Sequence, residues 1–191
     1  MPRPKPSRLM MMKPLCPTDL EGKLKNIVKG KKILILCVGN PIRGDDGAPQ
    51  LLFWKLRGNV VRLRLLDCGT SPQDCIDEVV RLEPRAVIFV NSIDRSLEPG
   101  TIILDELHST SSTGSSLIGH KFPLAWVALL LKIVGQQRNL VIETFLIGIQ
   151  IRSTKGGITV PVRKSVNKLS KVFKELDSIT KAFTSLETET A

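Results

Sequence analysis

The sequence lacks the patterns that identify several common classes of protein. Its four cysteines form no Cys-x-x-Cys pair, so neither a zinc ribbon nor a disulfide framework is indicated. The most apolar late run, residues 124–134, is interrupted by Lys132 and is too short to span a bilayer. The N-terminal segment has no uninterrupted apolar stretch of the kind that a secretory signal needs. We therefore expect a soluble cytoplasmic protein with free thiols and no membrane partner.

Most of the positive charge is concentrated at the N-terminus. The chain carries a net charge of +10, and residues 1–32 contain nine Lys and Arg side chains against two acidic ones. A basic, proline-rich segment of this kind is typically flexible. We therefore interpret 1–32 as a flexible leader, 33–182 as a single domain and 183–191 as a polar C-terminal tail. The charge then belongs to the leader, and no nucleic-acid partner is expected.

Strands and helices alternate along residues 33–182, and 191 residues with 42% apolar content can bury one substantial core. Such alternation predicts a sheet with helices on both faces. The expected fold class is α/β, a three-layer α/β/α sandwich around a mostly parallel, twisted sheet of about five strands. Strands are expected at 33–38, 60–66, 86–90, 101–104 and within 139–149, and helices from about 46, over 72–83, over 124–135 and from 161 onward.

The turn after the first strand, Gly-Asn-Pro-Ile-Arg-Gly-Asp-Asp-Gly over residues 39–47, is the most informative motif. It matches neither Gly-x-Gly-x-x-Gly nor Gly-Lys-Ser/Thr, and its two carboxylates would repel a phosphate, so a nucleotide-binding domain is disfavoured. A carboxylate directly after a parallel strand lies where open α/β sheets bind ligands. Asp45 and Asp46 therefore indicate a site for a cation or a neutral polar group. The alternative is that one of them only caps the following helix.

Polar side chains follow several of the predicted parallel strands and should converge on one edge of the sheet. One imidazole with carboxylates suits a borderline divalent cation such as nickel or zinc. The alternative for His120, one of only two histidines in the chain, is a solvated or packing role. The candidates in chain order are Asp45, Asp46, Asp67, Asn91, Asp94 and His120.

An ordered series of motifs over residues 33–180 resembles the hydrogenase maturation proteases. These endopeptidases remove a short C-terminal peptide from the large subunit of nickel–iron hydrogenases. A single Gly-Asp-Asp-Gly would be weak evidence, whereas the whole series in order is specific. The series comprises 37–40 with 44–47, Asp-Cys-Gly-Thr-Ser-Pro at 67–72, Glu-Pro at 83–84, Leu-Glu-Pro-Gly at 97–100, His-Lys-Phe-Pro-Leu at 120–124 and Phe-Leu-Ile-Gly-Ile-Gln at 145–150.

The resemblance implies a single domain with a catalytic, metal-contacting trio at Asp46, Asn91 and His120. It also implies that the protease recognises nickel already inserted in the large-subunit precursor, which is the expected partner. No permanently bound cofactor is then needed, although zinc or cadmium would occupy the site in vitro. We expect a monomer. Asp67, with Gly69 and Thr70 beside it, is the candidate for positioning the substrate's tail.

Asn91 departs from the family pattern, which has an acidic ligand at that position. An amide oxygen can coordinate a metal but brings no charge, so metal affinity should fall. Asp94, three residues farther on, is a candidate replacement. Two functions follow. The chain is either a hydrogenase maturation endopeptidase or a catalytically weakened binding module of the same fold that recognises the metallated precursor.

Overall fold

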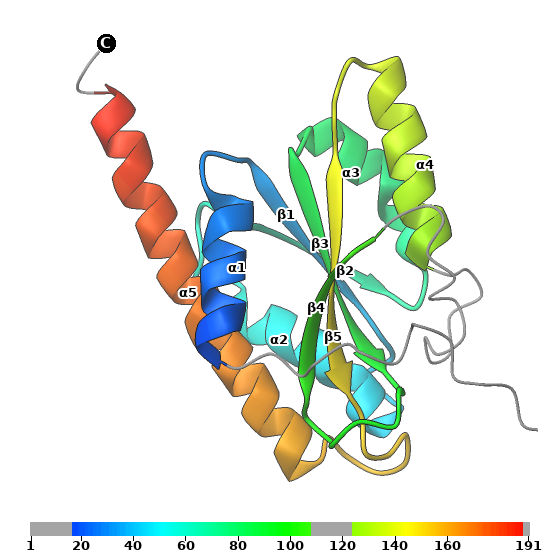
Figure 1. Cartoon of the computed structure of the whole chain (residues 1–191). Coiled ribbons are helices and arrows are strands. Elements are labelled where there is room, and N and C mark those ends of the chain that lie inside the picture. The colour runs from blue at the N-terminus through cyan, green and yellow to red at the C-terminus, as the bar shows by residue number, and fades with distance from the viewer. Residues whose placement is uncertain (1–16, 108–123, 189–191) are drawn as a thin grey trace, which may run out of the picture.

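The computed structural model describes residues 17–107 and 124–188 (Figure 1). Strands and helices alternate along the chain, as predicted. The elements are α1 (Pro17–Val28), β1 (Ile33–Val38), η2 (Gly44–Gly47), α2 (Ala48–Leu56), β2 (Arg64–Gly69), η3 (Pro72–Cys75), α3 (Ile76–Leu82), β3 (Ala86–Ile93), β4 (Ile102–Glu106), α4 (Leu124–Gln137), β5 (Glu143–Gln150) and α5 (Val160–Thr188).

A five-stranded sheet with the order β2-β1-β3-β5-β4 forms the middle layer. Strands β2, β1, β3 and β5 run parallel to one another, and β4 at the edge is antiparallel to β5. The predicted α/β sandwich with a mostly parallel sheet is therefore confirmed. The strand order reverses between β1 and β3, because β1 is followed by β2 on one side and by β3 on the other.

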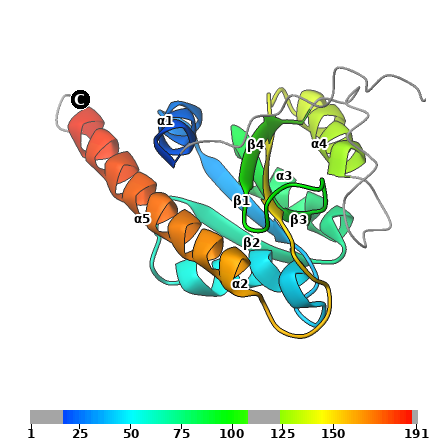
Figure 2. The ribbon, with the colours of Figure 1, turned by 60° about the horizontal axis from the view of Figure 1, so that its bottom comes forward.

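Helices cover both faces of the sheet and bury its alternating side chains (Figure 2). Ile33, Ile35 and Cys37 of β1 point toward α1, α2 and α5, while Leu34 and Leu36 point toward α3 and α4. All six residues of β1 and all eight of β3 are buried, as expected for strands covered on both faces. Two apolar clusters result, one on each side of the sheet.

The interpretation of residues 1–32 as a flexible leader is wrong for residues 17–28. These residues form α1, whose Leu20, Leu24 and Val28 are at most 3% exposed and belong to the cluster that includes α5. A spacing of four places the three side chains on one face of the helix. Lys23 and Lys25 are exposed on the same helix, so part of the basic charge belongs to the fold. Residues 1–16 lie outside the described part of the chain.

Two predicted boundaries also differ from the structure: the end of the last helix and the start of the second strand. Helix α5 continues to Thr188, so the predicted tail at 183–191 is helical over 183–188. The second strand begins at Arg64 instead of residue 60. The reason is that the N–H groups of Val61, Arg62 and Leu63 donate to the carboxylate of Asp177 in α5 at 2.7–3.0 Å, which replaces strand pairing.

The cysteines were expected to be free thiols, and this is wrong for one pair. Cys68 at the end of β2 and Cys75 at the end of η3 form a disulfide with a Cα–Cα distance of 6.0 Å. Cys37 is a free, buried thiol, as predicted, and burial raises its pKa above the usual range, with a further contribution from Asp67. Cys16 lies outside the described residues. Among the helices that the structure describes, none combines the length and hydrophobicity that crossing a bilayer requires.

Candidate functional site

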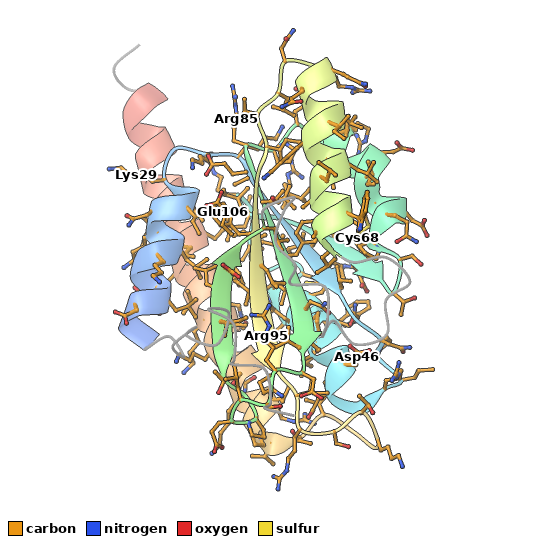
Figure 3. All side chains as sticks on the ribbon, turned by 45° about the vertical axis from the view of Figure 1, so that its right-hand side comes forward. Lys29, Asp46, Cys68, Arg85, Arg95 and Glu106 are labelled. Carbon is orange, nitrogen blue, oxygen red and sulfur yellow. A yellow bond between two sulfur atoms is a disulfide. The ribbon has the colours of Figure 1, made fainter. Side chains whose placement is uncertain are left out.

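The candidate residues at the ends of β1 and β3 lie at the carboxyl edge of the sheet, where the strand order reverses. Val38 of β1 is in register with Asn91 of β3, and Asn91 is in register with Gly148 of β5. Open α/β sheets bind ligands in the crevice at such a switch point. In Figure 3, Asp46 and Arg95 lie toward one end of the sheet, and Arg85, which precedes β3, lies toward the other.

The turn between β1 and α2 folds tightly against the sheet because two glycines permit it. A Cβ on Gly39 would lie 2.2 Å from the carbonyl oxygen of Asp46, so only glycine allows this approach. Gly44 has φ +52° and lies against the backbone of Ser153. The N–H of Asn40 donates to the carbonyl of Asp46 at 3.0 Å and closes the turn. The result is that both aspartates are fixed beside the end of β1.

Asp45 holds the loop before α5. Its carboxylate accepts hydrogen bonds from the N–H groups of Arg152, Ser153 and Thr159 and from the hydroxyl of Thr159, at 2.6–3.1 Å. Its side chain is 0% exposed. The hydroxyl of Ser92 in β3 donates to its backbone carbonyl at 2.9 Å. Asp45 therefore connects three parts of the chain at the carboxyl edge, and its oxygens are already used within the fold.

Asp46 follows in η2 and is 1% exposed. The N-cap position of α2 is Gly47, so neither aspartate is the cap of that helix. The alternative that one of them only caps the following helix is therefore wrong. The two neighbours differ in position, since Asp45 faces the 152–159 loop and Asp46, the ligand candidate, lies beside the end of β1.

Asn91 lies inside β3 and not after it, because the strand continues to Ile93. It is 0% exposed, and its Oδ1 accepts a hydrogen bond from the N–H of Ser92 at 2.8 Å. By the alternation of the strand, its side chain shares the α3/α4 face with Val87 and Phe89. Asn91 thus places an amide oxygen, a possible metal ligand, at the switch point.

Asp94 is turned away from this position. It lies past the end of β3, is exposed, and its Oδ1 accepts a hydrogen bond from Nε2 of Gln150 at 3.2 Å. The candidate replacement for the missing acidic ligand is therefore engaged with β5. His120 lies outside the described residues. Within the described ranges, no group of three or more His, Cys, Asp or Glu side chains gathers as a metal site would require.

The residues expected to position the substrate's tail lie at the end of β2 and just after it. Asp67 is exposed, and its Oδ1 accepts hydrogen bonds from the N–H of Gly69 at 3.1 Å and from Nε2 of Gln50 at 3.0 Å. Gly69 has φ +50°, and Thr70 is exposed directly after it. Asp67 thus stabilises a sharp turn at the carboxyl end of β2, next to the end of β1.

Gln50 is a further candidate site residue, which the sequence alone did not indicate. It lies in α2 and is 3% exposed, with Oε1 buried and without a hydrogen-bond partner among the described residues. Its Nε2 joins α2 to Asp67, so it connects the ends of β1 and β2. The available signal was its spacing, four residues after Asp46, which places the two on the same side of the helical segment.

Comparisons with known proteins show which family has this sequence and fold. A family model described as hydrogenase maturation protease matches residues 55–175. The chain is 30% identical over 121 residues to the hydrogenase 3 maturation protease of Escherichia coli K12, covering 61% of this chain and 71% of that protein. The crystal structure of the NiFe hydrogenase maturation protease HycI from Thermococcus kodakarensis has a TM-score of 0.72 at 25% identity, covering 82% of this chain and 99% of that one. The solution structure of the endopeptidase HycI from Escherichia coli gives 0.61 at 25% identity, covering 73% and 87%. The chain therefore belongs to the hydrogenase maturation protease family.

Proposed function

We propose that this protein is a cytoplasmic endopeptidase that removes the C-terminal peptide of a nickel–iron hydrogenase large-subunit precursor after nickel insertion. The observation that carries the proposal is the position of Asp46 and Asn91. Both are buried oxygen donors at the switch point of a sheet whose fold and sequence belong to the maturation proteases. Nickel is part of the substrate in this proposal, so the protease needs no resident metal.

The two described donors suit recognition of a divalent cation. The carboxylate of Asp46 supplies negative charge, and at 1% exposure its attraction for a cation is screened less than on an open surface. The amide oxygen of Asn91 supplies a neutral ligand, which hard and borderline cations accept more weakly than a carboxylate. The protein's task is then to hold these oxygens where the nickel-bearing cleavage segment docks.

His120 completes the proposed trio as an imidazole ligand. The described chain resumes at Leu124, four residues later, and Leu124 is 0% exposed in the apolar cluster that also contains Val38 and Phe89. Leu124 therefore belongs to the α3/α4 face of the sheet. Asn91 shares that face.

Asp67, Gly69 and Thr70 have a second proposed role in positioning the tail of the substrate. Asp67 and Thr70 are exposed at the edge of the sheet, next to β1, the strand that leads into the turn with Asp46. An exposed carboxylate and hydroxyl can accept hydrogen bonds from the N–H groups of an extended peptide. We propose that the segment to be removed passes along this turn.

A second function, recognition of the precursor without efficient cleavage, is favoured by Asn91 itself. The resemblance implies an acidic ligand at this position, and an amide in its place removes a charge from the proposed metal contact. The protein would then bind the nickel-loaded precursor and release it uncut. This alternative uses the same site and the same partner as the protease.

The experiment that separates these functions is incubation of the purified protein with nickel-loaded and nickel-free precursor, followed by mass spectrometry of the large subunit. Shortening of only the nickel-loaded form supports the proposed endopeptidase. Binding of that form without shortening supports the recognition module. Equal cleavage of both forms would exclude recognition through the metal.

A further inference from the structure

An uncovered apolar stripe runs along α4. Trp126, Leu130 and Ile133 follow one another at spacings of four and three residues and are 60%, 42% and 43% exposed. This spacing places them on one side of the helix, and we call the three side chains the α4 stripe. The opposite side of α4 is buried against the sheet through Leu124, Val127, Ala128 and Leu131.

No charge interrupts the α4 stripe. The only charged residue in α4 is Lys132, and its Nζ donates to the carbonyl of Leu107 at 3.2 Å, on the side toward the sheet edge. A surface helix normally presents polar residues opposite its buried face, and a helix that is apolar on both sides is normally covered. The α4 stripe is therefore a candidate interaction surface.

The stripe begins at the end of α4 that points toward the carboxyl edge of the sheet. Helix α4 ends where β5 begins, at the amino edge of the parallel strands, so its first turn points toward the carboxyl edge (Figure 1). Leu124 in that turn packs in the cluster that contains Val38, the residue in register with Asn91. Trp126 follows two residues later. The stripe therefore starts on the side of α4 toward the carboxyl edge, where the precursor is proposed to be held.

The size of the stripe argues against a stable dimer of this chain. Three side chains at these exposures offer on the order of 300 Å², against about 800 Å² per partner in a standard stable interface. Such an area suits one part of a larger contact that is shared with the active site. A transient complex with a folded substrate has this character, because the substrate must be released after cleavage.

We propose that the α4 stripe docks an apolar patch on the folded body of the large-subunit precursor, while the carboxyl edge holds its nickel-bearing cleavage segment. This inference rests on the proposed function and adds a second contact to it. The stripe contributes affinity for the folded precursor and takes no part in the chemical step. Trp126 is the expected main contributor, since exposed tryptophans dominate the energetics of many interfaces.

The test compares Trp126→Ala with Trp54→Ala in the full chain. Trp54 is a matched control because it is also 60% exposed but lies on α2, where it contacts Phe53 and Arg57. KM and kcat are measured for cleavage of the nickel-loaded precursor, with melting temperature and molar mass in solution for each variant. We expect Trp126→Ala to raise KM on the order of ten-fold with kcat unchanged, and Trp54→Ala to match the parent.

Four results would overturn the inference. Equal KM for Trp126→Ala and Trp54→Ala would mean that the stripe does not touch the precursor. A much larger loss of thermal stability in Trp126→Ala would mean that residues 108–123 of this chain cover it. A dimer of the parent that only Trp126→Ala dissociates would mean that a second copy covers it. Failure of the parent itself to bind or cleave the precursor would instead refute the proposed function, and this inference with it.

Discussion

Adjacent aspartates in η2 have different surroundings, and a single substitution should separate their roles. Asp45 accepts four hydrogen bonds from the 152–159 loop while fully buried. Asp45→Ala leaves these donors without their acceptor, so we expect the free energy of unfolding to fall by about 3 kcal/mol or more. Urea denaturation measures this change. Asp74→Ala, an exposed aspartate in η3, is the control and should change it by less than about 0.5 kcal/mol.

Asn91 is the residue at which metal affinity can be tested by gain. Asn91→Asp would keep an oxygen for the N–H of Ser92 and add a negative charge at the proposed metal contact. We expect binding of Ni²⁺, Zn²⁺ or Cd²⁺ to tighten by ~1–3 kcal/mol, allowing for an effective dielectric well above that of a dry interior. Calorimetric titration of the parent and the variant measures the change.

The same titration contains its own controls. Asp46→Asn and His120→Ala should each remove most metal binding in either background, because each removes a proposed ligand. If affinity is unchanged in both Asn91→Asp and His120→Ala, the metal site lies elsewhere. Asp94 is exposed, and its carboxylate accepts a hydrogen bond from Gln150. Asp94→Asn should therefore leave the metal affinity unchanged.

At the scale of elements, α1 is the largest difference between expectation and structure, and it is directly testable. Leu24 is 0% exposed between α1 and the rest of the core. Leu24→Ala removes buried methyl groups and leaves a cavity, so we expect the free energy of unfolding to fall by about 2–5 kcal/mol. Asn26→Ala, exposed on the same helix, should change it by less than about 0.5 kcal/mol. Equal and small losses would mean that α1 does not pack in solution.

The strands that build the site were predictable because their patterns are local. Six consecutive apolar residues identify β1, and the glycines after it identify a tight turn that presents acidic side chains. Asn91 was correctly expected at the carboxyl edge, although the strand extends two residues past it. The amphipathic face of α1 was present in the spacing of Leu20, Leu24 and Val28, but the surrounding lysines and prolines favoured a flexible interpretation.

What the sequence did not reveal depends on contacts between distant residues. The start of β2 is set by Asp177, which lies more than 100 residues away and accepts hydrogen bonds from three N–H groups of the preceding loop. The role of Asp45 depends on Thr159 in the same way. Gln50 became a candidate only because the fold brings it to Asp67. No local pattern contains such information.

At the scale of the whole molecule, the proposed activity is concentrated at one edge of the sheet. Asp46, Asn91 and the turn at Asp67 lie at the carboxyl ends of β1, β3 and β2, and the α4 stripe leads away from that edge. Helices α1 and α5 pack together on the opposite face of the sheet (Figure 1). The precursor is therefore expected to approach from the carboxyl edge and the α4 side.

The most direct measurement of this account is the cleavage rate of the nickel-loaded precursor by the parent, by Asp46→Asn and by Asp94→Asn, followed by mass spectrometry of the large subunit's C-terminus. Both substitutions neutralise an aspartate at the carboxyl edge, but only Asp46 belongs to the proposed nickel contact. The account predicts that Asp46→Asn lowers the rate on the order of 100-fold or more while Asp94→Asn cleaves like the parent. Unimpaired cleavage by Asp46→Asn, or equal losses in the two variants, would contradict it.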